Sequence, residues 1–103
     1  MTIPSELLEL WQQHSTAAFP DGYADKEINR INLSLLDAEM AGCIRLYIHN
    51  NGRIDPHQVK VLRDRLIDLN AIILLMDRDD LIYFDRLRKM ASLVLQEVEK
   101  ALG

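Results

Sequence analysis

The segment from Asp25 to Asn50 constrains the fold more than any other part of the chain, because its apolar residues recur at helical spacing on two separate flanks. At about 100° per residue, both flanks lie on one helix and only a narrow polar strip remains between them. The first flank carries Ile28, Ile31, Leu35, Ala38, Gly42 and Leu46. The second flank carries Leu33, Leu36, Met40, Cys43, Ile44 and Tyr47. We therefore predict one long helix over 25–50, capped by Asp25 and ended by Gly52, that needs cover on two sides.

The same reading predicts three further helices. A short helix over 5–14 begins with Ser5 as its N-cap and is followed by a turn-rich loop over 15–24. The clearest boundary is at Asp55, which has the position of an N-cap before Pro56, with Gln58 at the capping-box position. A long helix follows over 56–75, and the last helix covers 79–102. The apolar run over 70–76 also fits a buried strand, but the sequence offers no second strand to pair with it.

Length and composition limit the fold to one helical domain. The 103 residues are 49% hydrophobic and 27% charged, which is typical of a single globular domain over 1–103. We expect an all-α fold: an antiparallel helical bundle of three long helices plus the short N-terminal helix. The net charge of -4 disfavours a nucleic-acid partner. A single cysteine, no leader-like start and no long apolar stretch indicate a cytoplasmic protein with no membrane partner.

The two apolar flanks predict self-association. A bundle of three long helices covers only part of this surface, and the end of the third helix is apolar on all sides. We therefore expect a homodimer with two-fold symmetry, which completes a larger bundle and leaves apolar surface that could engage another protein. The predicted interface residues are Leu33, Leu36, Met40, Ile44, Tyr47, Ile72 and Leu75. The alternative is a self-sufficient monomer, in which the first helix and the loop with Phe19 and Tyr23 cover the second flank.

Four polar residues are candidates for partial burial. Asn32 and Glu39 are seven residues apart and lie between the two apolar flanks, and Arg63 and Asn70 show the same spacing near the core edge of the third helix. Buried polar groups of this kind more often pair or fix the register of helices than act in catalysis. We predict a pairing or register role for them.

No motif predicts a catalytic residue, a metal site or a cofactor. His49 and His57 flank a turn with Asp55, but their spacing matches no zinc signature, and we expect structural roles. Cys43 is six residues from His49, about 120° away on the same helix, and is expected to pack in the core. His14 is expected at the surface. No histidine follows a glutamate by three residues, as a di-metal carboxylate bundle requires.

Two basic groups are the best case for a nucleic-acid partner. They consist of Lys60, Arg63 and Arg65, and of Arg86, Arg88 and Lys89. Asp64, Asp68 and Asp85 interrupt them, as expected for solvated helix faces of mixed charge.

Taken with the apolar flanks, these features predict a non-enzymatic cytoplasmic interaction module that acts as a homodimer. The alternatives are a small enzyme or ligand-binding bundle, with its pocket near Glu39 and Asn32 or at the turn from His49 to His57, and a regulator that associates with nucleic acid.

Overall fold

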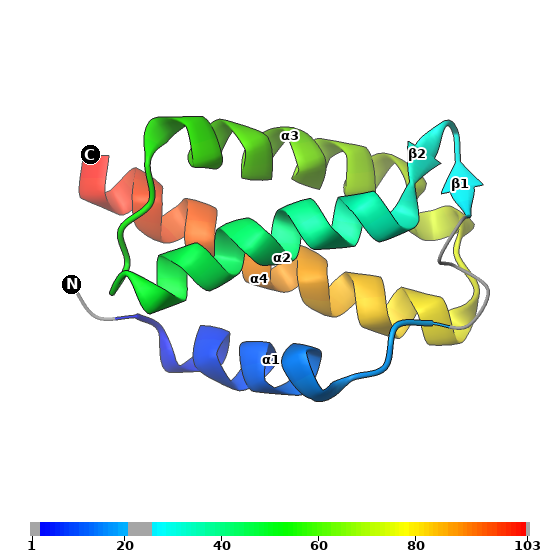
Figure 1. The fold of residues 1–103 in the computed structure, drawn as a ribbon, viewed down its shortest axis with the longest axis horizontal. Coiled ribbons are helices and arrows are strands. Elements are labelled where there is room, and N and C mark those ends of the chain that lie inside the picture. The colour runs from blue at the N-terminus through cyan, green and yellow to red at the C-terminus, as the bar shows by residue number, and fades with distance from the viewer. Residues whose placement is uncertain (1–2, 21–25, 103) are drawn as a thin grey trace.

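The structure, a computed structural model, describes residues 3–20 and 26–102, and this part of the chain folds into four α-helices and one very short hairpin (Figure 1). The all-α fold class is thereby confirmed. The elements are α1 (Ser5–Thr16), β1 (Glu27–Ile28), β2 (Ile31–Asn32), α2 (Leu33–His49), α3 (Pro56–Ile72), the 3-10 turn η1 (Ile73–Leu75) and α4 (Arg78–Leu102). None of the helices in the described ranges is both long enough and apolar enough to cross a membrane.

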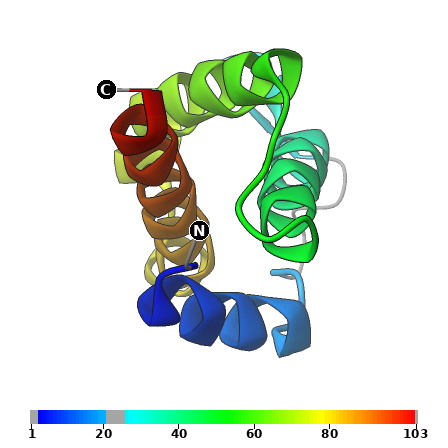
Figure 2. The ribbon, with the colours of Figure 1, turned by 90° about the vertical axis from the view of Figure 1, so that its left-hand side faces the viewer.

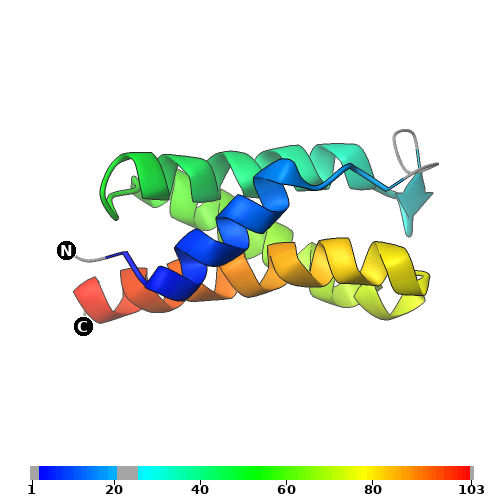
Figure 3. The ribbon, with the colours of Figure 1, turned by 90° about the horizontal axis from the view of Figure 1, so that it is seen from below.

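The four helices surround a common core. Figure 1 shows α2 and α3 side by side with α4 behind them, and Figure 2 shows all four helices around one centre. α1 crosses α2 and α4 obliquely, which is clearest from below in Figure 3. The molecule measures 38 × 25 × 18 Å along its principal axes. α1 therefore closes the side of the core that α3 does not reach.

The first helix differs from the prediction at both ends. Its N-cap is Pro4 rather than Ser5, and no side chain caps it. The Pro4 carbonyl oxygen instead accepts hydrogen bonds from Leu7 and Leu8. At the other end the helix continues to Thr16, whose hydroxyl bonds back to the Gln12 carbonyl at 3.0 Å. Backbone and side-chain bonds within the last turn thus extend the helix beyond residue 14.

The predicted helix over 25–50 is wrong in its first part, because residues 27–32 form a hairpin. Glu27 pairs with Asn32, and Ile28 pairs with Ile31. The two residues between the strands, Asn29 and Arg30, have φ of 52° and 68°, which is the signature of the tight turns that suit hairpins.

The observed start of α2 lies directly after this hairpin. The helix begins at Leu33, and the side chain of Asn32 caps it by accepting from the Leu35 amide at 2.8 Å. Asp25, the predicted cap, lies outside the described residues.

The remaining helix boundaries follow local hydrogen bonds that the sequence predicts. Gly52, with φ of 87°, donates to the Tyr47 carbonyl at 2.8 Å and closes the end of α2. The Asp55 side chain accepts from the Gln58 amide at 2.9 Å, directly before Pro56. α3 and η1 together reach Leu75, so residues 70–76 contain no strand, and α4 begins at residue 78, one residue earlier than predicted.

The predicted dimer interface is wrong for six of its seven residues, because they form the core of a single chain. Each of these six side chains is at most 2% exposed. They are Leu33, Leu36, Met40, Ile44, Tyr47 and Ile72. Only Leu75 remains at the surface, with 61% exposure. The second flank of α2 is buried against helices of its own chain, and α1 supplies Leu7, fully buried, to the same core.

Candidate functional site

A buried polar network joins three helices through Asp37 of α2. One carboxylate oxygen of Asp37 lies 3.1 Å from Nε2 of His14 in α1, and the other accepts a hydrogen bond from the Tyr83 hydroxyl of α4 at 3.0 Å. His14 and Tyr83 are 6% and 8% exposed. The expectation that His14 is a surface residue is therefore wrong. No sequence motif marks this network, whose members are far apart in the chain.

The chemistry of the network favours a structural role. Both oxygens of Asp37 are occupied, and burial, with the nearby Asp37 charge and hydrogen bond, raises the pKa of Tyr83. The ring of His14 packs against that of Tyr83 at 4.7 Å between centroids and against Trp11 at 6.2 Å. Nδ1 of His14 is buried, and no described residue bonds to it. The network therefore fastens α1 to α2 and α4, with the neutral phenol of Tyr83 as donor.

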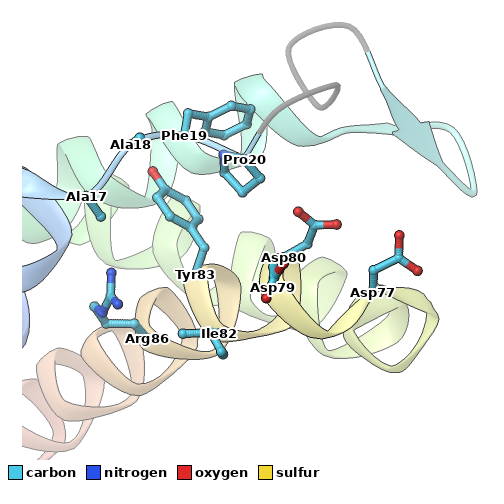
Figure 4. A pocket seen from close by; sticks show the side chains of 10 residues that line it. All are labelled: Ala17, Ala18, Phe19, Pro20, Asp77, Asp79, Asp80, Ile82, Tyr83 and Arg86. Carbon is cyan, nitrogen blue, oxygen red and sulfur yellow. The ribbon is translucent and has the colours of Figure 1, made fainter.

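Tyr83 also lines a cavity of about 510 Å³, which separates the segment over residues 17–20 from the start of α4 (Figure 4). The lining side chains are apolar, aromatic and charged. They are Ala17, Ala18, Phe19, Pro20, Asp77, Asp79, Asp80, Ile82, Tyr83 and Arg86. Phe19 packs edge-on against Tyr83 and against Phe84, with centroids 5.5 and 6.1 Å apart. These ring contacts hold the segment over 17–20 in place above α4.

Two oppositely charged groups in this cavity have no ion-pair partner among the described residues. Asp80 is 8% exposed, and Figure 4 shows its carboxylate pointing from α4 toward Phe19 and Pro20. No residue in the described part of the chain hydrogen-bonds to it or forms an ion pair with it. Nη1 of Arg86 is buried and likewise lacks a partner among the described residues. The sequence pattern placed Arg86 in a basic group on a solvated helix face and gave no indication that Asp80 is buried.

The predicted polar candidates divide into two pairs with different outcomes. Asn32 and Glu39 are half-buried and line a cavity of about 270 Å³ between α2 and α3, but Asn32 acts there as the helix cap. Arg63 and Asn70 are exposed, so the expectation that they lie near the core edge is wrong. The pair that faces Glu39 from α3 is instead Arg65 and Asp68, whose charged groups are 2.9 Å apart.

The turn between α2 and α3 does not bring its histidines together around one cavity. His49 and His57 are both exposed. A cavity of about 680 Å³ at this turn is lined by His49 and Asp55, whereas His57 lines a different one. Across residues 3–20 and 26–102, no cluster of three or more histidine, cysteine or acidic side chains is arranged to hold a metal ion.

Cys43 is a buried thiol. Its sulfur donates to the Gln58 carbonyl at 3.6 Å, and it is 6% exposed. Burial raises its pKa, and the charges of Glu39 and Asp55 add to this effect. Because only the thiolate is strongly nucleophilic, these surroundings favour core packing over catalysis.

The basic groups are largely paired with aspartates of their own helices. Asp85 shows the balance of effects, because burial alone would raise its pKa, whereas hydrogen bonds from Arg88 and Lys89 outweigh this and lower it. The ion pairs are Lys60–Asp64, Arg65–Asp68, Arg88–Asp85 and Lys89–Asp85. These helix faces thus carry both signs of charge.

The first flank of α2 remains open to solvent. Leu35 is 57% exposed and Leu46 is 39% exposed, and Ala38 lies between them at the surface. A methyl group added at Gly42, also exposed, would meet no atom within 4 Å. We call Leu35, Ala38, Gly42 and Leu46 the outer flank of α2.

The chain matches no protein-family model, no curated protein and no solved structure.

Proposed function

We propose that this protein is a small, cytoplasmic, non-enzymatic interaction module that pairs with a second copy of itself through the outer flank of α2. The observation that carries the proposal is the uncovered apolar surface of this flank, where Leu35 and Leu46 are 57% and 39% exposed. The homodimer predicted from the two-sided helix is thus retained, but on the opposite side of the helix. The lone free thiol, Cys43, is in keeping with a reducing compartment.

The outer flank has the shape that a second helix needs. Its four residues are all exposed, so a neighbouring helix can reach them from the solvent. Gly42 stands in the middle of the flank, where the absence of a side chain lets two helix backbones come close. Leu35 and Leu46 lie on either side of it and supply the apolar area to be buried.

Unpaired charges on the two edges of the flank favour a second copy as the partner. Glu39 and Arg45 lie about 60° to either side of Gly42 on the helix, and neither forms an ion pair within the described residues. In a two-fold pair with parallel α2 helices, each Glu39 lies on the same edge as Arg45 of the second copy. The offset along the axis is six residues, or about 9 Å, which two long side chains can bridge.

An antiparallel two-fold pair is less favourable on the same grounds. Rotation about an axis perpendicular to α2 brings Glu39 of both copies to one edge and Arg45 of both copies to the other. Like charges on one edge repel, and neither charge then meets its opposite. The charges of Glu39 and Arg45 on the two edges of the flank therefore favour the parallel arrangement.

Sedimentation equilibrium over a range of concentrations tests the proposal. The wild-type protein should show a reversible monomer–dimer equilibrium, and Leu35→Glu combined with Leu46→Glu should abolish it. The matched control is Ile67→Glu on α3, because Ile67 is exposed to a similar extent, at 61%, and should leave the dimer intact. A wild-type protein that stays monomeric at every concentration, or a dimer lost only in the control, would contradict the proposal.

A charge swap tests the parallel arrangement. Glu39→Arg and Arg45→Glu should each weaken dimerisation, because each places like charges side by side. The double variant restores opposite charges in exchanged positions and should recover most of the wild-type affinity. Additive losses in the double variant would exclude parallel pairing on this flank.

A further inference from the structure

Two oppositely charged side chains, Asp80 and Arg86, line the cavity at the start of α4 and form no ion pair with any described residue. Asp80 is more than nine-tenths buried, and its carboxylate is aimed into the cavity (Figure 4). Nη1 of Arg86 is buried in the same lining without a hydrogen bond. A buried polar group without a hydrogen bond costs the folded state free energy. An unpartnered carboxylate aimed into the cavity and an unpartnered guanidinium nitrogen in the same lining point to a ligand that supplies the missing partners.

The two charges do not neutralise each other. They are six residues apart on α4, which corresponds to a rise of about 9 Å, and Figure 4 shows Tyr83 between them. The Tyr83 hydroxyl is already committed to Asp37 at 3.0 Å. The ring of Tyr83 therefore presents apolar surface to the middle of the cavity, and Phe19 and Pro20 face it from the opposite wall.

The charged lining residues give the two ends of the cavity opposite signs of charge. Asp77 and Asp79 are exposed lining residues near Asp80, so this end is negative. At the other end, Arg86 is the one basic residue among the lining side chains of the described chain. The volume of about 510 Å³ lies within the range of roughly 300–1,000 Å³ that is usual for small-molecule sites.

We propose that this cavity binds a small zwitterion whose ammonium group and carboxylate are separated by an apolar segment, as in an ω-amino acid or a dipeptide. The ammonium group pairs with Asp80, the carboxylate pairs with Arg86, and the apolar segment lies along Tyr83 and Phe19. Binding requires no covalent step and does not depend on pairing of two copies.

Calorimetric titration with three probes of one chain length tests the assignment. The probes are 6-aminohexanoate, hexylamine and hexanoate, which carry both charges, only the positive charge and only the negative charge. We expect 6-aminohexanoate to bind roughly tenfold or more tightly than either of the others, because it supplies a partner to both Asp80 and Arg86. Equal binding of hexanoate and 6-aminohexanoate, or no binding of any probe, would overturn the proposal.

Variants at the two ends give opposite selectivities. Asp80→Asn should weaken the binding of 6-aminohexanoate about tenfold or more and leave the binding of hexanoate unchanged. Arg86→Gln should also weaken the binding of 6-aminohexanoate but leave the binding of hexylamine unchanged. Asp79→Asn, at an exposed lining residue, is the matched control for Asp80 and should change affinity by less than about threefold. Equal losses in Asp79→Asn and Asp80→Asn would show a diffuse acidic surface and overturn the site.

Thermal melting without ligand provides a readout that separates a binding role from a structural one. Asp79 and Asp80 both lie in the first turn of α4, where a carboxylate gains from the helix dipole. Asp79→Asn therefore measures the loss of that gain alone. Asp80→Asn also removes an unpaired charge from a residue that is only 8% exposed, so its melting temperature should be the higher of the two. A lower melting temperature for Asp80→Asn would mean that the carboxylate supports the fold itself.

Discussion

Tyr83 donates a hydrogen bond of 3.0 Å to Asp37, although 46 positions separate the two residues in the sequence. The same carboxylate lies 3.1 Å from His14, so one side chain of α2 connects the first helix with the last. Each of these contacts removes polar atoms from water and gives them a partner at once. The network therefore fixes how α1 and α4 sit on α2 more specifically than apolar packing alone would.

Loss of Asp37 should cost more stability than loss of either of its partners. Asp37→Ala leaves the Tyr83 hydroxyl and His14 buried without an acceptor, and we expect the free energy of unfolding to fall by about 2–4 kcal/mol. Tyr83→Phe removes one donor and should cost about 1 kcal/mol. Denaturant titration measures both. The control is Asp68→Ala, which breaks a partly exposed ion pair with Arg65 and should cost less than about 1 kcal/mol. If Asp37→Ala cost no more than this control, the role of the network would be contradicted.

The raised pKa of Tyr83 predicts a loss of stability in alkaline solution. In the unfolded chain the phenol ionises near its ordinary pKa of about 10, whereas burial and the Asp37 charge keep it protonated in the folded chain to higher pH. The contribution of the phenol is therefore complete below pH about 10 and declines as the pH rises further. Denaturant titrations across this range should show a flatter decline for Tyr83→Phe. Part of the decline should persist, because burial also raises the pKa of Tyr47; identical curves for variant and wild type would contradict the prediction.

Adjacent leucines of α2 should differ sharply in their contribution to stability. Leu36 is 2% exposed and Leu35 is 57% exposed. Leu36→Ala opens a cavity in the core and should cost about 2–5 kcal/mol, whereas Leu35→Ala should change stability by less than about 0.5 kcal/mol. The measurement is denaturant unfolding at a protein concentration low enough for the monomer to dominate. Equal costs at the two positions would mean that the buried second flank and the exposed outer flank of α2 have been assigned wrongly.

The hairpin turn should be improved by glycine at its second position. Arg30 has φ of 68°, a left-handed conformation that glycine adopts without the steric cost of a side chain. We expect Arg30→Gly to raise the free energy of unfolding by about 0.5–1 kcal/mol. Arg53→Gly, at an exposed loop residue outside the left-handed region, is the control and should bring no gain. A gain in both variants, or in neither, would rule out backbone strain as the cause.

Among the features that depend on neighbouring residues, the start of α3 could be predicted from the sequence, whereas the hairpin could not. The start of α3 rests on one hydrogen bond between Asp55 and Gln58, three residues apart, and the pattern that predicts it is local. The hairpin was missed because Ile28 and Ile31 also fit helical spacing. What decides between the two structures is the left-handed turn at Asn29 and Arg30, and hydrophobic periodicity carries no information about that turn.

The parts that depend on long-range packing could not be predicted. The pattern of α2 shows two apolar flanks, but which of them its own chain covers depends on where α1, α3 and α4 lie. The cavity at the start of α4 depends on long-range packing even more clearly. Asp80 and Arg86 are ordinary polar residues in the sequence, and the tertiary packing of α4 and the segment over 17–20 brings them into one cavity lining. No spacing rule relates these two parts of the chain.

The position of α1 has a consequence for how the chain reaches its folded state. α1 packs mainly against α4, and α1 precedes α4 in the chain, so during synthesis α1 emerges before the helix against which it docks. Until α4 has been synthesised, the second flank of α2 has no complete cover, and its apolar side chains are open to misassociation with other nascent proteins. Docking of α1 is therefore a late step of folding, and a chain that stops short of residue 78 lacks the helix against which α1 mainly packs.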